Sequence, residues 1–225
     1  MIAVIKPAEK YPSPADLTRM ALLRAGLKLF GRKGYEATST RELAALAKAN
    51  IGSIAYHFGG KEGLHLACAD FIVETIQSIA KPALAEAAAA LTPETAAEGL
   101  KQSIERIVSF FVASPEVGDF AQFVLRELSV PSPALDRLYN GVFAPTHAQL
   151  CRVWEQATGE PAESEATKIR MFTLIGQVVY FRIAREAVLR RMGWSDIGPE
   201  QAKAIASVAV DNLTAVLASR KGNKP

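Results

Sequence analysis

The chain has 225 residues, of which 49% are apolar, and a formal net charge of +3. Gln, Arg, Glu or Gly interrupts every apolar stretch before the roughly 18 to 20 positions that a bilayer span needs, and Lys6 and Pro7 come too early for a secretory signal. Cys68 and Cys151 lie far apart with no Cys or His at ligand spacing, which indicates two buried thiols and neither a disulfide framework nor a zinc motif. We therefore expect a cytoplasmic protein with no membrane span, no metal and no cofactor.

Basic charge is concentrated in the first quarter of the chain. Residues 1–61 contain ten lysines and arginines against four acidic residues, a charge of +6, whereas residues 62–225 contain sixteen against nineteen, a charge of −3. A mildly basic surface is common among proteins, so this distribution favours a polyanionic partner only modestly.

Apolar residues recur at spacings of three and four along the whole chain, and no stretch sustains an alternation of period two. This pattern predicts an all-α fold. The first helix is expected to begin near Asp16, a good N-cap residue, and to end at Gly31 to Gly34. Residues 1–14 contain three prolines and no apolar stripe, so we expect a flexible arm there. The stripe of the first helix consists of Leu17, Met20, Leu23, Leu27 and Phe30.

Further helices are predicted along the chain, each bounded by proline, glycine or a short polar turn. The alanine-rich stretch 83–100 is expected to form a helix, a turn and a second helix, with the break at Thr92 and Pro93. Residues 220–225 are expected to be a disordered tail. The remaining predicted helices cover 40–47, 51–57, Lys61 toward Pro82, 94–113, 116–129, 133–157, 164–192 and 199–219.

The stretch 38–64 has the pattern of a helix-turn-helix. Ser39 followed by Glu42 fits a capping box, so a helix begins there. Leu43, Ala44 and Ala47 form an inward face, and after a break at 48–50 a second inward face follows with Ala49, Ile54 and Phe58. Two short helices joined in this way place the second helix in the DNA major groove.

The polar residues outside these inward faces carry the argument for DNA. All can form hydrogen bonds and none is acidic, which suits phosphate and base contacts, and Gly52 would let the second helix approach the duplex closely. The alternative is a pair of surface helices whose polar face is simply solvated. The residues are Thr40, Arg41, Ser53, Tyr56, His57 and Lys61.

The composite pattern T-x-R-E-L-A followed by I-x-Y-H-F-G-x-K-E-x-L, from Thr38 to Leu64, resembles the DNA-binding domain of the TetR family of bacterial transcriptional regulators. The resemblance extends back to about residue 17. It implies that Thr40, Tyr56, His57 and Lys61 clamp phosphates, and that Arg41, Gly52, Ser53 and Ala55 lie nearest the bases. The turn usually carries glycine where this chain has Lys48, which would cost about 1 kcal/mol if the positive φ is kept. Lys48 could then add a phosphate contact.

Helix 164–192 is apolar on nearly every side, so it must be covered both by its own domain and by a second surface. The last helix offers small residues for close contact, namely Ala204, Ala206, Ala209 and Ala215. An isologous homodimer would also place two reading heads about one helical turn apart, roughly 34 Å. TetR relatives typically dimerise through their last two long helices. The alternative is a large monomeric core.

Residues 123–139 and 175–194 resemble the C-terminal domain of the CecR-like branch of the TetR family. This resemblance implies a small-molecule effector inside the helical domain, commonly an apolar or amphiphilic compound or an antibiotic. For each candidate contact taken singly, packing in the core is the competing explanation. The candidates are Phe110, Phe111, Phe123, Arg126, Phe143, His147, Tyr180 and Arg182.

An enzyme is not expected. The three histidines, His57, His65 and His147, do not belong to an HExxH motif, a nucleophile elbow or a phosphate loop, so we assign no catalytic residue. The predicted organisation is an arm at 1–14, a helix-turn-helix DNA-binding domain at 15–64, a ligand-binding and dimerisation domain at 65–219 and a tail at 220–225. The predicted function is that of a repressor released from a pseudo-palindromic operator in double-stranded DNA by an effector. The alternative is an effector-independent regulator or activator.

Overall fold

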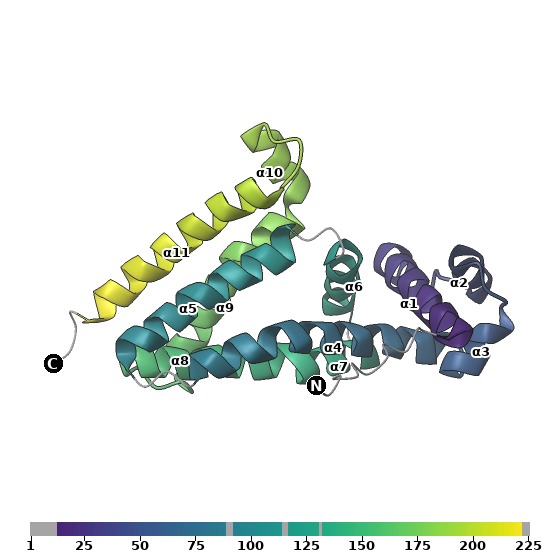
Figure 1. Cartoon of the computed structure of the whole chain (residues 1–225), viewed down its shortest axis with the longest axis horizontal. Coiled ribbons are helices and arrows are strands. Elements are labelled where there is room, and N and C mark those ends of the chain that lie inside the picture. Colours follow the sequence, from purple (N-terminus) through teal and green to yellow (C-terminus); the bar gives the residue numbers. More distant parts are fainter. Residues whose placement is uncertain (1–12, 89–91, 114–116, 131, 222–225) are drawn as a thin grey trace, which may run out of the picture.

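The computed structural model describes residues 13–88, 92–113, 117–130 and 132–221, and every regular element in these ranges is helical, which confirms the all-α prediction. Three helices form a head at one end of the molecule, and a long fourth helix runs from the head along the body (Figure 1). Most of the predicted arm and of the predicted tail, residues 1–12 and 222–225, lies outside the described residues. The four helices are α1 (Pro14–Lys33), α2 (Thr40–Ala47), α3 (Gly52–Phe58) and α4 (Lys61–Ala88).

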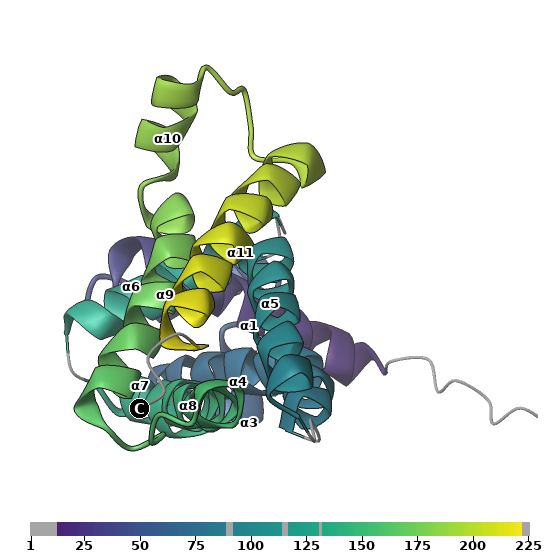
Figure 2. The same ribbon diagram turned by 90° about the vertical axis from the view of Figure 1, so that its left-hand side faces the viewer.

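The other helices form the body. Between the head and the rest, α6 packs on α1 and stands across α4, whereas α7 packs on α4 (Figure 1). Helices α5, α8, α9 and α11 form a bundle at the far end, as the two views in Figures 1 and 2 show. Two short π-helical turns, η1 and η2, are inserted into this series. The elements are α5 (Pro93–Val108), η1 (Ser109–Ala113), α6 (Val117–Ser129), α7 (Pro133–Leu138), η2 (Tyr139–Phe143), α8 (Ala144–Thr158), α9 (Glu165–Ile183), α10 (Arg185–Met192) and α11 (Pro199–Lys221).

The start of α1 differs from the prediction. Ser13, not Asp16, is the N-cap residue, and Asp16 is the third helical residue of a capping box. The Ser13 hydroxyl accepts the Asp16 N–H at 3.1 Å, and the Asp16 carboxylate accepts the Ser13 N–H at 3.0 Å. Pro14 explains the earlier start, because its fixed φ suits the first turn of a helix and its missing N–H costs nothing there.

Several long helices are divided differently from the sequence pattern. The predicted break at Thr92 and Pro93 is confirmed, since Thr92 caps α5, but α4 continues through Pro82 to Ala88. Helix 94–113 ends in the π turn η1, and helix 133–157 is divided by η2. Helix 164–192 breaks at Ala184, whose backbone has φ −96° and ψ 25°. A π turn adds one residue to a helical turn without changing the apolar spacing much, so periodicity alone does not reveal it.

The buried apolar side chains of the described residues form two cores. The core of the head includes Phe123 of α6 and Ala134 and Leu138 of α7, so the head packs directly on these helices. Helices α1 and α6 approach closely at Gly31, where a Cβ atom would lie 2.9 Å from the backbone nitrogen of Phe123. The other buried members of this core are Leu22, Leu23, Leu27, Phe30, Leu43, Ala44, Ile54, Leu64, Cys68, Ala69 and Ile72.

The second core lies among the body helices, with the fully buried Trp154 of α8 among its members. Helix α11 contributes a buried row to it, consisting of Ala202, Ile205, Ala209, Leu213 and Leu217. In the described part of the chain, one helix, Pro199–Arg220, is long and apolar enough by length and composition to cross a membrane, with a mean hydropathy of 1.2. A helix in the core of a protein meets the same length and composition criteria. The buried row of α11 fits this explanation.

Candidate DNA-binding site and the joint behind it

The predicted capping box at the start of α2 is present. The Ser39 hydroxyl accepts the Glu42 N–H at 3.2 Å, and the Glu42 carboxylate accepts the Ser39 N–H at 3.0 Å. The other Glu42 oxygen forms an ion pair with Lys33 at the end of α1. The hydrogen bond from Lys33, followed by those from Ser39, lowers the pKa of Glu42 to about 2. These contacts fix the orientation of α2 relative to α1.

The turn between α2 and α3 has the geometry expected for glycine. Lys48 adopts the left-handed conformation, with φ 51° and ψ 41°. Among the described residues, it is the one residue other than glycine that has a positive φ. The backbone N–H of Ala49 donates to the Ala44 carbonyl at 2.9 Å, and the Asn50 side chain accepts the Gly52 N–H at 2.8 Å. The chain therefore keeps the positive φ of the family's usual glycine at Lys48, which the sequence left open, and the lysine side chain is exposed.

Helix α3 has one buried face and one open face. Ile54 is buried with Leu43 and Ala44 of α2, which confirms the predicted inward faces. Tyr56 on the open face is 82% exposed. Phe58 is half-buried, with the guanidinium of Arg19 5.6 Å from the centre of its ring. The short α3 is therefore attached to the head by its apolar side and leaves its polar side free.

The structure brings the predicted DNA-contacting residues together on α2, the turn, α3 and the first residue of α4. Each is exposed or half-exposed, as contact with a duplex requires. Lys61 also lies over the ring of Tyr35, with its Nζ atom 4.2 Å from the ring centre. The nine residues are Thr40, Arg41, Lys48, Gly52, Ser53, Ala55, Tyr56, His57 and Lys61.

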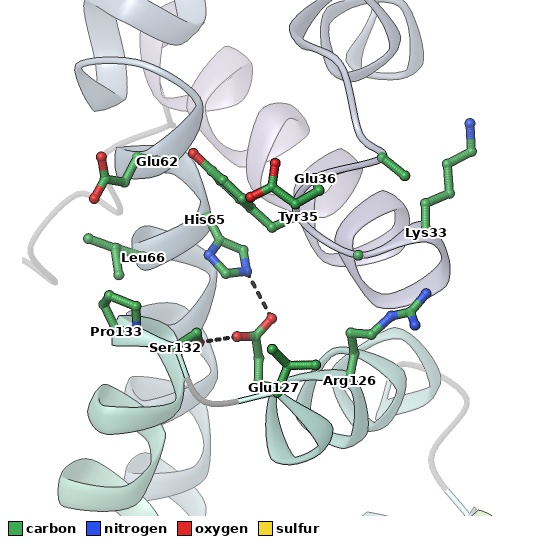
Figure 3. Close-up of a pocket in the computed structure, with 13 residues that line it drawn as sticks. Lys33, Tyr35, Glu36, Glu62, His65, Leu66, Arg126, Glu127, Ser132 and Pro133 are labelled. Carbon is green, nitrogen blue, oxygen red and sulfur yellow. Dashed lines mark hydrogen bonds and ion pairs between the residues drawn. The ribbon is translucent and has the colours of Figure 1, made fainter.

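A buried polar cluster lies at the joint between the head and the body. His65 of α4 and Glu127 of α6 are both about 5% exposed, and His65 Nε2 lies 2.9 Å from Glu127 Oε1. The second oxygen of Glu127 accepts the hydroxyl of Ser132, which caps α7 (Figure 3). Burial by itself raises the pKa of Glu127, but the hydrogen bonds from His65 and Ser132 outweigh burial and lower it. One carboxylate thus connects α4, α6 and α7.

Aromatic rings surround His65 on the side facing the head. Its ring centre lies 4.8 Å from that of Phe30 in α1 and 4.9 Å from that of Tyr35 in the following loop. The ring of Phe123 in α6 lies 5.2 Å away. Beside this cluster, the guanidinium of Arg126 donates to the Arg32 carbonyl at 3.1 Å, at the end of α1. The joint therefore holds α1, α4 and α6 through both polar and aromatic contacts.

Comparison with known proteins gives two family matches along the chain. Residues 22–68 match the model of the bacterial regulatory proteins of the tetR family, and residues 96–220 match the C-terminal domain of the HTH-type transcriptional dual regulator CecR. The CecR protein of Shigella flexneri is 32% identical over 207 residues, which cover 90% of this chain and 92% of CecR. The chain belongs to the TetR family. This TetR-family chain is therefore a DNA-binding transcriptional regulator and not an enzyme.

Solved structures share the fold. The regulator AibR, solved with isovaleryl coenzyme A and operator DNA, has a TM-score of 0.64 at 17% identity, over 86% of this chain and 96% of AibR. The TetR-family regulator PfmR from Thermus thermophilus has a TM-score of 0.59 at 18% identity, over 85% of this chain and 96% of PfmR. At these identities the likeness concerns the fold, a helix-turn-helix head on a larger helical body.

The predicted effector contacts of this TetR-family chain are spread over several places. Phe123 is buried in the core of the head, Phe143 packs against that core, and Arg126 lines a cavity at the joint. The ring of His147 stacks on Phe172 at 4.0 Å, whereas Tyr180 is 59% exposed. Phe110 and Phe111 are half-buried in η1. Arg182 is half-buried as well, and burial, followed by Arg185, lowers its pKa.

Two cavities accompany these residues. An apolar cavity in the body, lined by residues such as Leu100, Met171 and Val178, has a volume of about 20 Å³, which is room for about one water molecule. A much larger cavity of about 480 Å³ lies at the joint, bounded by residues of the head, α4, α6 and the start of α7. Of the eight predicted effector contacts, Arg126 lines the larger cavity, and none of the eight lines the smaller one.

Sequence reasoning missed the joint. His65 and Glu127 are 62 residues apart, so no local spacing relates them. The available signal was a glutamate inside the amphipathic run 117–129, at a position that the helical period places on the buried side. Both cysteines are free and buried, as predicted, and burial raises the pKa of each thiol. The described residues contain no cluster of three or more His, Cys, Asp or Glu that could hold a metal ion.

Proposed function

We propose that this TetR-family chain is a homodimeric repressor in the cytoplasm that leaves a pseudo-palindromic operator when a small molecule binds. The observation that supports this proposal is the shared core, in which Phe123, Ala134 and Leu138 of the body pack with the head. Close-packed interiors change between discrete arrangements and do not deform smoothly. A shift of α6 or α7 would therefore move the head, and with it α3.

The division of labour on DNA follows the family pattern and the exposure of each residue. Thr40, Lys48, Tyr56, His57 and Lys61 would contact phosphates, which fixes the position of the head on the duplex. Arg41, Gly52, Ser53 and Ala55 would lie nearest the base edges and read the sequence. The operator would be double-stranded DNA with two half-sites about one helical turn apart.

The homodimer is supported by an apolar row on the outer side of α9. Its large members are more than half exposed in the single chain, at spacings that place them along one side of the helix. Gly176 lies within this row, and a Cβ atom there would meet nothing within 4 Å, so a second helix could approach closely. The row consists of Ile169, Phe172, Gly176, Tyr180 and Ile183. Exposed Ala204, Val208 and Ala215 of α11 would extend the surface.

A regulator that senses no effector is the second candidate. The observation in its favour is the apolar cavity among the described body helices, whose volume of about 20 Å³ cannot admit a drug-sized ligand in this conformation. The S. flexneri relative carries the name of a dual regulator, so activation belongs to this candidate as well. A thermal shift with a set of apolar and amphiphilic compounds decides between the two, because a ligand of the folded state raises the melting temperature by mass action.

The test of the DNA proposal compares two head variants by fluorescence anisotropy on fragments tiled beside the protein's own gene. Lys61→Ala should weaken binding to all sequences alike and reduce the salt slope by about one. Arg41→Ala should relax sequence preference at one base position, at a cost of about 1 to 3 kcal/mol. Equal losses on operator and random DNA for both variants, or no binding to any fragment at low salt, would contradict the proposal.

A further inference from the structure

We infer that the cavity at the joint is a binding site for a small amphiphilic organic cation. The volume of about 480 Å³ lies within the range of small-molecule sites. Its walls come from three separate parts of the fold: the end of α1 with the loop that follows it, one face of α4, and the end of α6 with the start of α7. Figure 3 shows Tyr35, Glu36 and Glu62 on one side of the cavity and Arg126, Glu127 and Ser132 on the other.

The polar side chains at the bottom of the cavity, His65 and Glu127, already have hydrogen-bond partners. Glu127 uses one oxygen for His65 and the other for Ser132, and both His65 and Glu127 are buried. A ligand would gain little by replacing these bonds, because an unpaired carboxylate would then remain buried. The floor therefore sets the depth and shape of the site, and the charge of the ligand must be recognised at the rim.

The rim favours positive charge. Glu36 and Glu62 are exposed, and neither has an ion-pair partner among the described residues. Burial raises the pKa of Tyr35, and the negative charges of Glu62 and Glu36 raise it further. Two acidic groups without partners at the mouth of a cavity attract a cation and repel an anion.

The basic residues of the cavity are directed elsewhere. Lys33 forms its ion pair with Glu42 on the head, and Figure 3 shows its side chain turned away from the cavity. Arg126 donates to the Arg32 carbonyl and lies against Gly34, where a Cβ atom would come within 3.4 Å of its Nε atom. Lys61, outside the lining, already lies over the ring of Tyr35. The two rim carboxylates thus remain available to a ligand ammonium group.

Apolar side chains supply the rest of the site. Leu66 of α4 is half-buried, and Val130 at the end of α6 is 63% exposed. Pro133 at the start of α7 and Ala37 in the loop after α1 complete this side. Covering these groups removes apolar surface from water, which favours a ligand with a hydrophobic body. An aryl-alkyl ammonium ion combines both requirements.

The regulatory consequence rests on the proposed function. The cavity walls belong to the head on one side and to α6 and α7 on the other, so a shift between head and body would change the cavity. A ligand alters the head position only by the difference between its affinities for the two positions. Binding to the cavity can therefore be tested without DNA, and its effect on the operator can be tested separately.

The experiment uses 4-phenylbutylammonium, 4-phenylbutanol and 4-phenylbutyrate, which share one apolar body and differ in charge. Isothermal titration calorimetry on the full chain should show the cation binding about tenfold more tightly than the alcohol, and the carboxylate more weakly than both. The double variant Glu36→Gln, Glu62→Gln should remove this preference. Its control, Glu74→Gln with Glu105→Gln, makes the same charge change at exposed positions outside the cavity lining and should leave the preference intact.

A second variant tests the location. Val130→Trp places a bulky ring at the mouth of the cavity, on an exposed position that the fold does not need, and should abolish binding of the cation. No binding of the cation, equal binding of the three probes, or an unchanged preference in the double variant would overturn the site. If the cation binds as expected while operator affinity stays the same with and without it, the site stands and its role in operator release is overturned.

Discussion

Lys48 has a backbone conformation that suits glycine, with φ 51°. A non-glycine residue in this region carries a steric cost of about 1 to 2 kcal/mol. We predict that Lys48→Gly raises the free energy of unfolding by about 0.5 to 1 kcal/mol, measured by urea denaturation, because relief of strain exceeds the entropy cost of glycine. The control is Ala45→Gly at an exposed position inside α2, which should lower stability by about 1 kcal/mol. A lower stability for both variants would contradict the prediction.

A substitution at Gly52 should affect DNA binding without affecting the stability of the fold. It is exposed at the first residue of α3, and a Cβ atom there would meet the Asn50 Oδ1 atom at 3.3 Å. We predict that Gly52→Ala changes the free energy of unfolding by less than about 0.5 kcal/mol. Operator affinity should fall by about tenfold, because in the proposed complex the added methyl group would lie between α3 and the bases.

The matched control for Gly52 lies far from the head. Gly198, before α11, would place its Cβ atom 3.4 Å from the Gln201 Oε1 atom, a contact of the same kind. Gly198→Ala should leave both stability and operator affinity unchanged. Fluorescence anisotropy and urea denaturation measure the two quantities. Unaltered operator affinity in Gly52→Ala would place the DNA surface elsewhere.

At the scale of helices, Glu127 is the residue that connects α6 to α4 and α7. Its pKa is lowered in the folded chain, so it contributes stability above the ordinary glutamate pKa of about 4.3, and this contribution is lost as the pH falls through the lowered value. We predict that Glu127→Gln lowers the free energy of unfolding by about 1 to 3 kcal/mol at pH 7. The difference from the native chain should shrink toward pH 3.

The pH series needs a control in which an exposed ion pair is broken. Glu186→Gln in α10 removes the pair with Arg190, where both side chains are more than 70% exposed. Such exposed pairs contribute about 0 to 1 kcal/mol to stability. The free energy of unfolding of this variant should therefore stay close to that of the native chain across the pH range. Urea denaturation between pH 3 and pH 8 measures both. A constant difference between Glu127→Gln and the native chain over this range would contradict the assignment.

Local elements of the fold could be predicted from the sequence because their causes are local. The capping box of Ser39 and Glu42, the inward Ile54 and the strained Lys48 each depend on neighbours within a few residues. The joint could not be predicted, since Glu127 meets His65 across 62 residues and a helical period does not name the partner of a buried charge. The breaks at η2 and Ala184 were missed because apolar spacing continues through them.

At the scale of the whole molecule, the exposed apolar row of α9 is the surface through which we propose that the homodimer forms. Tyr180, in the second half of the row, is 59% exposed, so its side chain faces away from the core of its own chain. A charged residue at this position should destabilise the single chain little, because the side chain is exposed there. At an isologous interface the same charge would be buried without a partner, and the two-fold symmetry would place it there twice. We predict that Tyr180→Glu yields a monomer at micromolar concentration in sedimentation velocity, with a thermal unfolding transition still present.

The control for Tyr180→Glu is Met192→Glu, at a position that is 54% exposed at the end of α10 and outside the row. It should sediment like the native chain. A monomeric regulator holds one head against one half-site, so Tyr180→Glu should also lose operator affinity by far more than it loses affinity for a single half-site. If Tyr180→Glu remains a dimer, the interface lies on another face of the body, and the exposed row of α9 has a different partner.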